Sequence, residues 1–190
     1  MKTVYVIAGH EGKGTGATSK HPTSSSSFMD EGAETIILRD YIVYYLRVLY
    51  GIKAVVDDPR AGLFSVISWL KGIIGINDII LDIHFNAFED KNAHGTEVIV
   101  PTLASMVEKN AGYDLLHSVS TSLGTFPRGV FDETRSPHQR LGMLSGPSQA
   151  LNLLVEICFC TNENDTMKYY RNRIEVAKAI SGVLAKYAKL

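Results

Sequence analysis

Two polar side chains interrupt a buried segment near the middle of the chain. Residues 79–83 form a short apolar run rich in β-branched residues, which is typical of a strand covered on both faces. Asp82 and His84 lie on the same face of this strand because strand side chains alternate. A buried charge is costly unless it is paired or bound to a metal. A buried histidine can also be held by hydrogen bonds alone, so its assignment depends on other residues of the chain.

The last apolar segment contains one carboxylate. Strand alternation across residues 151–159 predicts two sets of side chains on opposite faces. One face is predicted to carry Leu151, Leu153, Val155, Ile157 and Phe159, and the other Leu154, Glu156 and Cys158. Ionised glutamate is almost never fully buried without a partner. Glu156 is therefore a candidate functional residue.

Further candidates lie in the first quarter of the chain. Residues 4–8 are predicted to form a strand, and His10 lies just past its carboxyl end, where open α/β sheets bind ligands. A long helix is predicted over residues 31–50, with Glu31 and Glu34 in its first turn. The helix dipole favours carboxylates at this position without any catalytic role. Periodicity does not separate the two glutamates, because neither lies on the polar side of the helix.

These residue types are those of metal-assisted hydrolysis. Two histidines and one carboxylate can hold zinc tetrahedrally and leave the fourth position for water. Hydrolysis also needs a general base, which a carboxylate that does not bind the metal can supply. The chain offers His10, His84, Glu156 and either Glu31 or Glu34 for these roles. Because these residues are far apart in the sequence, the fold must bring them together.

Strand and helix patterns alternate along the chain, which favours a largely parallel sheet with helices on both faces. Asp30 is a suitable N-cap for the first helix, and Gly51 a suitable C-terminal stop. We predict a three-layer α/β/α fold with a mixed, mostly parallel twisted sheet of about five to six strands. The predicted strands are 4–8, 53–56, 77–87, 95–100, 151–159 and a short edge strand at 140–144. The predicted helices are 31–50, 63–74, 105–123 and a final one that residues 161–165 cap and that reaches almost to Leu190.

Composition limits the class of protein. A chain of 190 residues suits a single domain spanning 1–190, and 45% apolar with 21% charged residues is ordinary for a globular protein. The net charge of −1 gives no electrostatic footprint for nucleic acid or for an anionic membrane. No apolar stretch suits a transmembrane helix, and the N-terminal one is too short for a signal peptide. Cys158 and Cys160 are predicted to be reduced core residues.

A glycine-rich segment after the first strand suggests a rival function. Residues 12–17 match the dinucleotide fingerprint G-x-G-x-x-A. That motif requires a helix to open at once, so that its N-terminus faces the phosphates. Here a further loop-like stretch with Pro22 and several serines follows instead, and no G-x-x-x-x-G-K-[ST] match exists. The sequence therefore does not favour nucleotide binding.

Five local patterns occur in a particular order. An apolar strand ends in Gly9-His10 and is followed by a glycine-containing loop; Glu31 opens a long helix; an H-x-N-A element occupies residues 84–87; Gly95-Thr96-Glu97 follows; and residues 153–159 carry Glu156, with Asn162 behind them. In this order they resemble the zinc-dependent N-acetylmuramoyl-L-alanine amidases of the amidase-3 type, which include autolysins and phage endolysins. The resemblance covers nearly the whole chain.

The resemblance implies that His10, Glu31 and His84 hold Zn²⁺ and that Glu156 is the general base. The implied reaction is hydrolysis of the peptidoglycan amide bond that joins the lactyl group of N-acetylmuramic acid to L-alanine of the stem peptide. Glu156 would take a proton from the attacking water and return it to the leaving L-alanine amine. The resemblance selects Glu31, because the spacing from Glu31 to Thr35 fits the helix of the family better than a start at Glu34.

Three features depart from the family pattern. Asp82 stands where the family usually has serine, two residues before its second histidine. It is a candidate for orienting a metal ligand through a hydrogen bond without binding the metal itself. Phe131 replaces the usual lysine after a Gly-Val pair. The loop Thr18–Phe28 has no clear counterpart, and no role is assigned to it. These differences bear on substrate preference more than on the type of reaction.

Weaker candidates for substrate contact are Asn86, in the H-x-N-A element, and Arg140, in the irregular segment 124–150. His138 lies in the same segment and is a further candidate. The expected partner is peptidoglycan or a muropeptide, with no stable membrane insertion and a monomer favoured. Without a signal peptide or a separate wall-binding domain, we expect synthesis in the cytoplasm and action on the cell wall after release, as in phage or prophage lysis.

Two alternatives remain open from the sequence. The same fold and metal would suit a zinc carboxypeptidase or peptidase that cleaves within stem peptides. A catalytically silent peptidoglycan-binding module would need Glu156 only for structure. The complete set of ligand candidates argues against a silent module, because such a module need not keep a position open for water.

Overall fold

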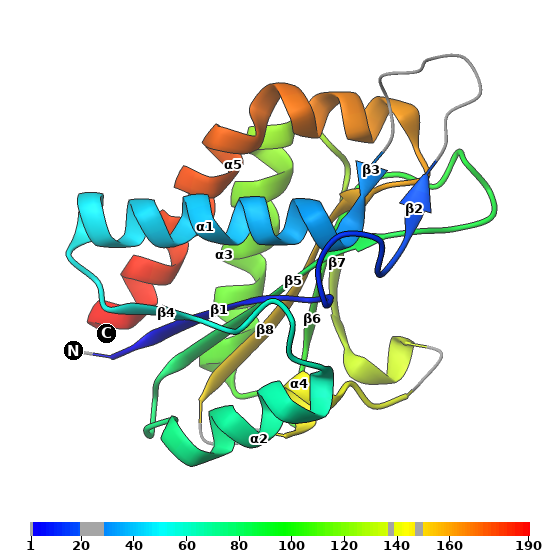
Figure 1. Cartoon of the computed structure of the whole chain (residues 1–190). Helices are drawn as coiled ribbons and strands as arrows, with labels where there is room; N and C mark the ends of the chain where they lie inside the picture. The colour runs from blue at the N-terminus through cyan, green and yellow to red at the C-terminus, as the bar shows by residue number, and fades with distance from the viewer. Residues whose placement is uncertain (1, 20–28, 137–138, 147–149) are drawn as a thin grey trace.

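A six-stranded sheet forms the centre of the computed structural model, which describes residues 2–19, 29–136, 139–146 and 150–190 (Figure 1). The strand order is β4-β1-β5-β8-β6-β7. Neighbouring strands are parallel except β6 and β8, which are antiparallel. The strands are β1 (Val4–Ala8), β4 (Ala54–Val56), β5 (Ile79–Asn86), β6 (Thr96–Val100), β7 (Pro127–Asp132) and β8 (Leu151–Phe159). The predicted mixed, mostly parallel sheet is confirmed.

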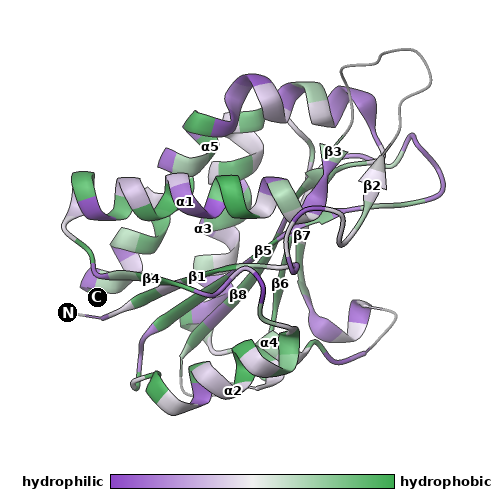
Figure 2. Ribbon diagram, in the orientation of Figure 1, coloured by the Kyte–Doolittle hydropathy of each residue, from purple (hydrophilic) through white to green (hydrophobic). Residues whose placement is uncertain are grey.

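Helices cover both faces of this sheet, as a three-layer fold requires. On one face lie α1 (Glu31–Tyr50), α3 (Met106–Leu123) and α5 (Glu163–Lys189), and on the other α2 (Leu63–Ile73) and the single turn α4 (Gly142–Ser145). The larger hydrophobic core lies under the first group and a smaller one under α2 and α4. Hydrophobic and hydrophilic residues alternate around α1 and α5 (Figure 2). Within the described residues, no helix has the length and apolarity needed to cross a bilayer.

The start and end of α1 follow from its capping residues. The Asp30 carboxylate accepts a hydrogen bond from the Ala33 backbone N–H at 3.0 Å, which satisfies a donor that the first turn leaves unpaired. Gly51 ends the helix in the left-handed region, with φ of 63°, where glycine has no Cβ penalty. The predicted bounds of this helix are confirmed. Its N-terminus, with Glu31, lies at the carboxyl ends of β1 and β5.

An extra residue in β8 alters the predicted strand faces. His84 pairs with Glu156 and Asn86 with Phe159, so that the pairing shifts by one residue at a β-bulge. Beyond the bulge, Cys158 lies in the large core, whereas Phe159 faces the opposite side and lines a cavity. The predicted faces of Cys158 and Phe159 are therefore wrong, because strict alternation assumes a regular strand. Both cysteines are free and buried, as expected.

The predicted edge strand at residues 140–144 is also wrong. Residues 142–145 form the helical turn α4, and the edge strand is β7. The cause is Glu133, a buried carboxylate in the 3₁₀ turn η1 (Glu133–Arg135). Its Oε2 accepts hydrogen bonds from the Leu141 backbone N–H and the Ser145 hydroxyl, each at 2.7 Å. These two bonds hold the segment in a turn instead of an extended edge.

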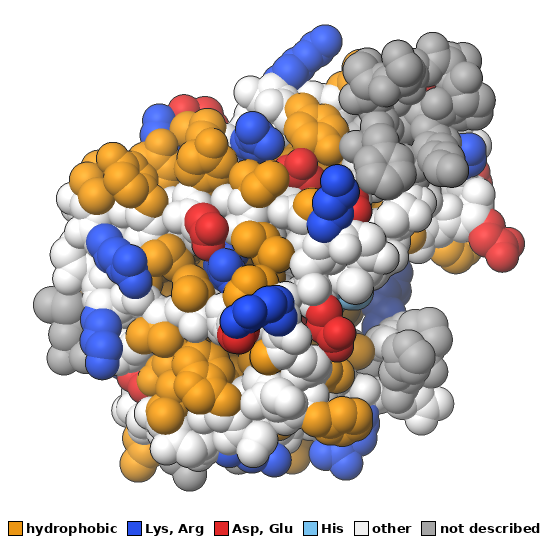
Figure 3. Space-filling model, in the orientation of Figure 1, with side chains coloured by type: hydrophobic (Ala, Val, Ile, Leu, Met, Phe, Trp, Pro, Cys, Tyr) orange, Lys and Arg blue, Asp and Glu red, His pale blue; other side chains and the backbone are white. Residues whose placement is uncertain are grey.

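Two short strands lie where a continuous loop was expected. Thr18–Ser19 (β2) pairs antiparallel with Met29–Asp30 (β3) beside the start of α1. Most of the loop Thr18–Phe28 lies outside the described residues, as does His138. The space-filling view shows hydrophobic side chains over α1 and α2 (Figure 3). The exposed hydrophobic residues of these helices include Tyr44 and Phe64. They lie on the outer surfaces of these helices.

Candidate metal centre and active site

Three potential metal ligands meet at the carboxyl ends of β1 and β5. The Glu31 Oε1 lies 3.0 Å from His10 Nε2 and 3.3 Å from His84 Nδ1. The two imidazole rings are edge to face, with centroids 5.0 Å apart. One ligand atom from each of the three residues lies within 4.8 Å of the others. The structure therefore brings together residues that are up to 74 positions apart in the chain.

Backbone donors hold the Glu31 carboxylate in place. Its Oε1 accepts from the Phe85 N–H at 2.9 Å, and its Oε2 from the Ala17 N–H at 2.7 Å. Burial alone would raise the pKa of Glu31, but the hydrogen bonds and charges of His10 and His84 outweigh it and hold the pKa well below its usual range. The carboxylate is thus ionised and available as a ligand.

Glu34, the alternative acidic ligand, faces away from the histidines. Its Oε2 accepts a hydrogen bond from the Tyr169 hydroxyl at 3.2 Å and lies 3.6 Å from the Arg173 guanidinium, both on α5. Burial raises its pKa, and Arg173 opposes the rise. Glu34 therefore joins α1 to α5, and only Glu31 of the two glutamates in this turn lies beside His10 and His84.

Asp82 supports His84 from the side opposite Glu31. The Asp82 Oδ2 lies 3.2 Å from His84 Nε2, while the other ring nitrogen faces Glu31. Burial would lower the pKa of His84, but the Asp82 and Glu31 carboxylates raise it well above its usual value. A proton on Nε2 that bonds to Asp82 leaves Nδ1 with a free lone pair for a metal. The predicted role of Asp82 in orienting a metal ligand stays a prediction.

Glu156 lies beside this cluster because of strand register. It pairs with His84 of β5 on one side and with Glu97 of β6 on the other. Within the described residues, its buried Oε2 has no hydrogen-bond partner. Burial raises the pKa of Glu156 to about 7; the Glu31, Glu97 and Asp82 carboxylates add to the rise, and His84 opposes it. A carboxylate with this pKa can both take and release a proton near neutrality.

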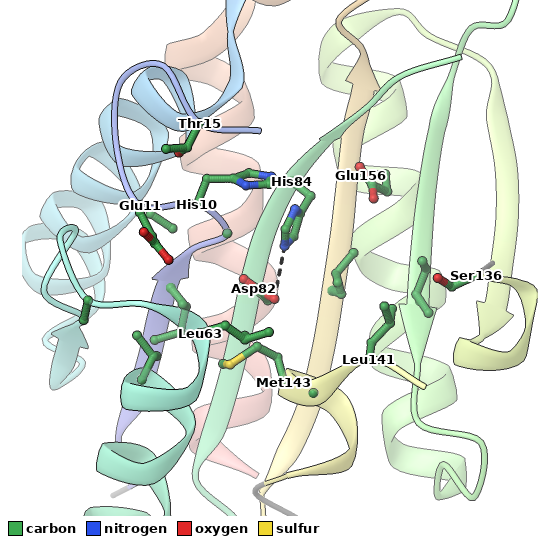
Figure 4. A pocket seen from close by; sticks show the side chains of 18 residues that line it. His10, Glu11, Thr15, Leu63, Asp82, His84, Ser136, Leu141, Met143 and Glu156 are labelled. Carbon is green, nitrogen blue, oxygen red and sulfur yellow. Dashed lines mark hydrogen bonds and ion pairs between the residues drawn. The ribbon is translucent and has the colours of Figure 1, made fainter. Parts of the chain in front are cut away.

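A cavity of about 610 Å³ opens onto these residues. Figure 4 shows His10, His84 and Glu156 around its upper part, with Leu63, Met143 and Leu141 below them. The lower walls come from α2 and the segment around α4, which explains why they are largely apolar. An extended substrate could place one bond at Glu156 and the histidines while its remainder lies against this wall.

Comparison with known proteins identifies the family. A sequence model of the amidase-3 family, described as N-acetylmuramoyl-L-alanine amidase, matches residues 4–186. The chain belongs to this amidase family. The amidase is therefore an enzyme of the hydrolase class, which acts on peptidoglycan. Its predicted resemblance to the family is confirmed, whereas no curated protein matches its sequence.

Solved structures share the fold of the amidase. An N-acetylmuramoyl-L-alanine amidase from Clostridium difficile 630 has 18% sequence identity and a TM-score of 0.78, over 99% of this chain and 97% of that one. The catalytic domain of CwlV, an N-acetylmuramoyl-L-alanine amidase from Bacillus (Paenibacillus) polymyxa var. colistinus, has 17% identity and a TM-score of 0.78, and the match covers 100% of this chain and 99% of that one. The catalytic domain of the CD27L endolysin, which targets Clostridia difficile, has 17% identity and a TM-score of 0.68, and the match covers 100% of this chain and 97% of that one. At these identities, the comparisons establish the architecture.

The two weaker substrate-contact candidates differ in position. Asn86 lines a second cavity of the amidase, next to Glu156, and its side-chain amide lies 3.4 Å from the Glu97 carboxylate. Arg140 is exposed and does not line either of the two cavities that Glu156 lines. Its predicted contact with substrate has no support from this geometry.

Sequence reasoning missed several side chains around the second cavity. Glu97 is a buried carboxylate that forms an ion pair with Arg128, whose guanidinium also lies over the Phe159 ring at 5.0 Å. Phe131, at the position of the usual lysine, lies under the Arg135 guanidinium at 3.8 Å. Glu97 was detectable as a lone carboxylate in an apolar strand, by the argument used for Glu156. The arginine contacts depend on pairing between β6 and β7 and have no local sequence signal.

Two glycines leave space for the histidines of the amidase. A Cβ on Gly9 would lie 2.3 Å from the His84 ring and 2.6 Å from the Ile83 carbonyl oxygen. A Cβ on Gly16 would lie 2.7 Å from both the His10 ring and the Glu31 carboxylate. The glycine-rich segment that resembles a dinucleotide motif therefore folds against His10, His84 and Glu31, and its Ala17 N–H donates a hydrogen bond to Glu31.

We expect Gly9→Ala to weaken metal binding by at least about tenfold. The new Cβ would force the His84 ring to move, because the Ile83 carbonyl oxygen, 2.6 Å from that Cβ, belongs to the backbone and cannot give way easily. Calorimetric titration of the metal-free protein with zinc measures this. The matched control is Gly72→Ala in α2, where a Cβ meets nothing within 4 Å. Parent-like affinity in the Gly9→Ala variant would contradict the packing argument.

Proposed function

We propose that the chain hydrolyses the amide bond between the lactyl group of N-acetylmuramic acid and L-alanine, with Zn²⁺ held by His10, Glu31 and His84. The donor set fits zinc, since two imidazole nitrogens and one ionised carboxylate form an open site. The observation that carries the proposal is Glu156, a carboxylate that lines the same cavity as the two histidines and whose buried Oε2 has no hydrogen-bond partner within the described residues. Family membership agrees with this bond.

Zinc at such a site supplies Lewis acidity, which lowers the pKa of water to about 7 and stabilises negative charge on a carbonyl oxygen. The remaining work falls to side chains of this chain. Glu156 accepts a proton from the water whose oxygen forms the new bond to the lactyl carbonyl carbon. It then donates this proton to the nitrogen of L-alanine as the carbon–nitrogen bond breaks. The products are a lactyl carboxylate on an intact glycan and a stem peptide with a free amine.

Asp82 positions His84 for this reaction, and backbone groups position Glu31. By accepting a hydrogen bond from His84 Nε2, Asp82 fixes the ring orientation and the tautomer. Glu31 is held in turn by the Phe85 and Ala17 N–H groups.

Product analysis tests the proposed bond. Digestion of purified peptidoglycan should release free stem peptides that begin with L-alanine and should leave unbroken glycan strands. Mass spectrometry of the soluble fraction, with a reducing-sugar assay, measures both. New reducing ends would indicate a glycosidase, cleavage within the stem would favour the peptidase alternative, and no release would favour a silent binding module.

Action on the cell wall after release from the cytoplasm, as in phage or prophage lysis, stays a prediction. So does the monomeric state. The proposed partner is peptidoglycan, in agreement with the family.

A further inference from the structure

A second cavity adjoins the proposed catalytic residues on the side of β6 and β7. Its volume is about 400 Å³, and it shares Glu156, Ile99 and Ser136 with the larger cavity. Ser136 lies across from Glu156 in the close view (Figure 4). Glu156 therefore stands where the two cavities meet. A substrate whose scissile bond lies at Glu156 can extend into both of them.

Two arginines line this second cavity, and only one of them is paired with a carboxylate in the part of the chain that the structure describes. Arg128 is engaged: its Nε bonds to the Glu97 carboxylate, and its Nη1 donates to the His94 carbonyl oxygen at 3.1 Å. Glu97 neutralises its charge. Arg128 thus mainly holds the wall of the cavity together.

Arg135 is exposed and forms no ion pair with any carboxylate in the part of the chain that the structure describes. Its guanidinium carbon lies 3.8 Å above the centre of the Phe131 ring. This contact supports the plane of the guanidinium and leaves its N–H groups free to bind a planar anion. Arg135 is thus an uncompensated cation on the wall of a cavity that also contains Glu156.

The two carboxylates next to Arg135 in the sequence are bound elsewhere and do not pair with its guanidinium. Glu133 is buried and is used by the Leu141 N–H and the Ser145 hydroxyl. Asp132 caps the turn by accepting from the Thr134 N–H at 2.9 Å. Both acids therefore fix the turn that carries Arg135, so that its guanidinium is presented from a rigid base.

The chemistry of the substrate indicates what this cation binds. In the intact amide, the lactyl carboxyl group is consumed in the scissile bond, so the sugar side carries no carboxylate there. Free carboxylates belong to the stem peptide, beginning with the residue after L-alanine when that residue is glutamate linked through its side chain. On the wall of the second cavity, Arg135 offers such a carboxylate a cation with planar N–H donors.

We propose that Arg135 binds a free carboxylate of the stem peptide, within a residue or two of the scissile bond, and thereby selects acidic over amidated stems. The second cavity then holds the peptide, and the larger cavity the lactyl and sugar side. This inference rests on the proposed function. It adds a specificity-determining residue that does not take part in the chemistry.

Two matched substrates test this role. Both carry the γ-carboxyl of D-glutamate as a methylamide, which mimics the side-chain link of the stem. One is N-acetylmuramoyl-L-alanyl-D-glutamate γ-methylamide, whose α-carboxylate is free, and the other is the same compound with its α-carboxyl converted to an amide. Arg135→Gln should raise KM for the acid by about 10- to 100-fold, the usual effect of losing a charged hydrogen bond. KM for the amide should change less than about threefold, and kcat should change little for either. The KM of Arg135→Lys for the acid should lie between those of the parent and Arg135→Gln. The control is Arg171→Gln, which replaces an exposed arginine on α5.

Binding measurements separate this proposal from the proposed reaction. Calorimetric titration of Glu156→Gln and of the Glu156→Gln, Arg135→Gln double variant with both compounds reports affinity without turnover. A loss of affinity for the acid alone supports Arg135, even if the parent cleaves neither compound and the proposed reaction fails. Equal affinity of both variants for the acid, or equal losses for acid and amide, overturns the proposal.

Discussion

The Glu156→Gln variant is expected to lose at least about 10²- to 10⁴-fold in amidase activity, the usual contribution of general acid–base catalysis. It should keep bound zinc, because Glu156 lies outside the His10, Glu31 and His84 cluster. Glutamine is nearly isosteric with glutamate but cannot accept the proton of water. Activity is measured by release of L-alanine-terminated stem peptide, and zinc by plasma emission.

Stability distinguishes a catalytic Glu156 from a structural one. Burial raises the pKa of Glu156 to about 7. Protonated Glu156 therefore contributes its full stability to the fold below the unfolded pKa, near 4.5, and this contribution is lost as the pH rises through 7. The charged form therefore weakens the fold at pH 8. Metal-free Glu156→Gln should melt no lower than the parent at that pH. Activity within about tenfold of the parent, with zinc bound, would remove Glu156 from the mechanism.

Glu31→Gln is expected to lose nearly all bound metal and activity, whereas Glu34→Gln should keep both. The two positions share the first turn of α1 and differ in their contacts. Glu31 lies 3.0 Å from His10, and Glu34 bonds to Tyr169 on α5. Removing a carboxylate ligand leaves two imidazoles, which form an incomplete site.

Metal content per chain, measured after dialysis, gives the result without an activity assay; about one zinc per parent chain is expected. Glu34→Gln should lower the melting temperature instead, because it weakens a buried contact between α1 and α5. Retention of zinc by Glu31→Gln with loss in Glu34→Gln would show that the ligand is misassigned.

Much of the fold could be predicted because its signals are local. Asp30 and Gly51 mark the ends of α1, and the apolar runs at 4–8 and 151–159 mark two strands whose bounds agree with the structure. His84 and Glu156 were found as polar residues within apolar strands. That argument needs only alternation and the cost of burying a charge.

The features that escaped prediction depend on contacts between distant segments. The bulge in β8 arises from its pairing with β5, and it redirects Phe159 into a cavity. The turn at α4 arises from Glu133, which recruits residues eight and twelve positions later. Arg135 acquires its position only when its turn is anchored in this way. Local composition contains no trace of these arrangements.

The position of β8 in the sheet has a consequence for synthesis. This strand is the last in the sequence, yet it lies between β5 and β6. A chain that emerges from the ribosome N-terminus first therefore holds two unpaired strand edges until residue 159 is free. During that time it already contains His10, Glu31 and His84 but lacks Glu156. We therefore expect nascent chains, and chains truncated before residue 151, to be inactive because they lack the proposed general base, and to be prone to aggregate because two strand edges stay unpaired.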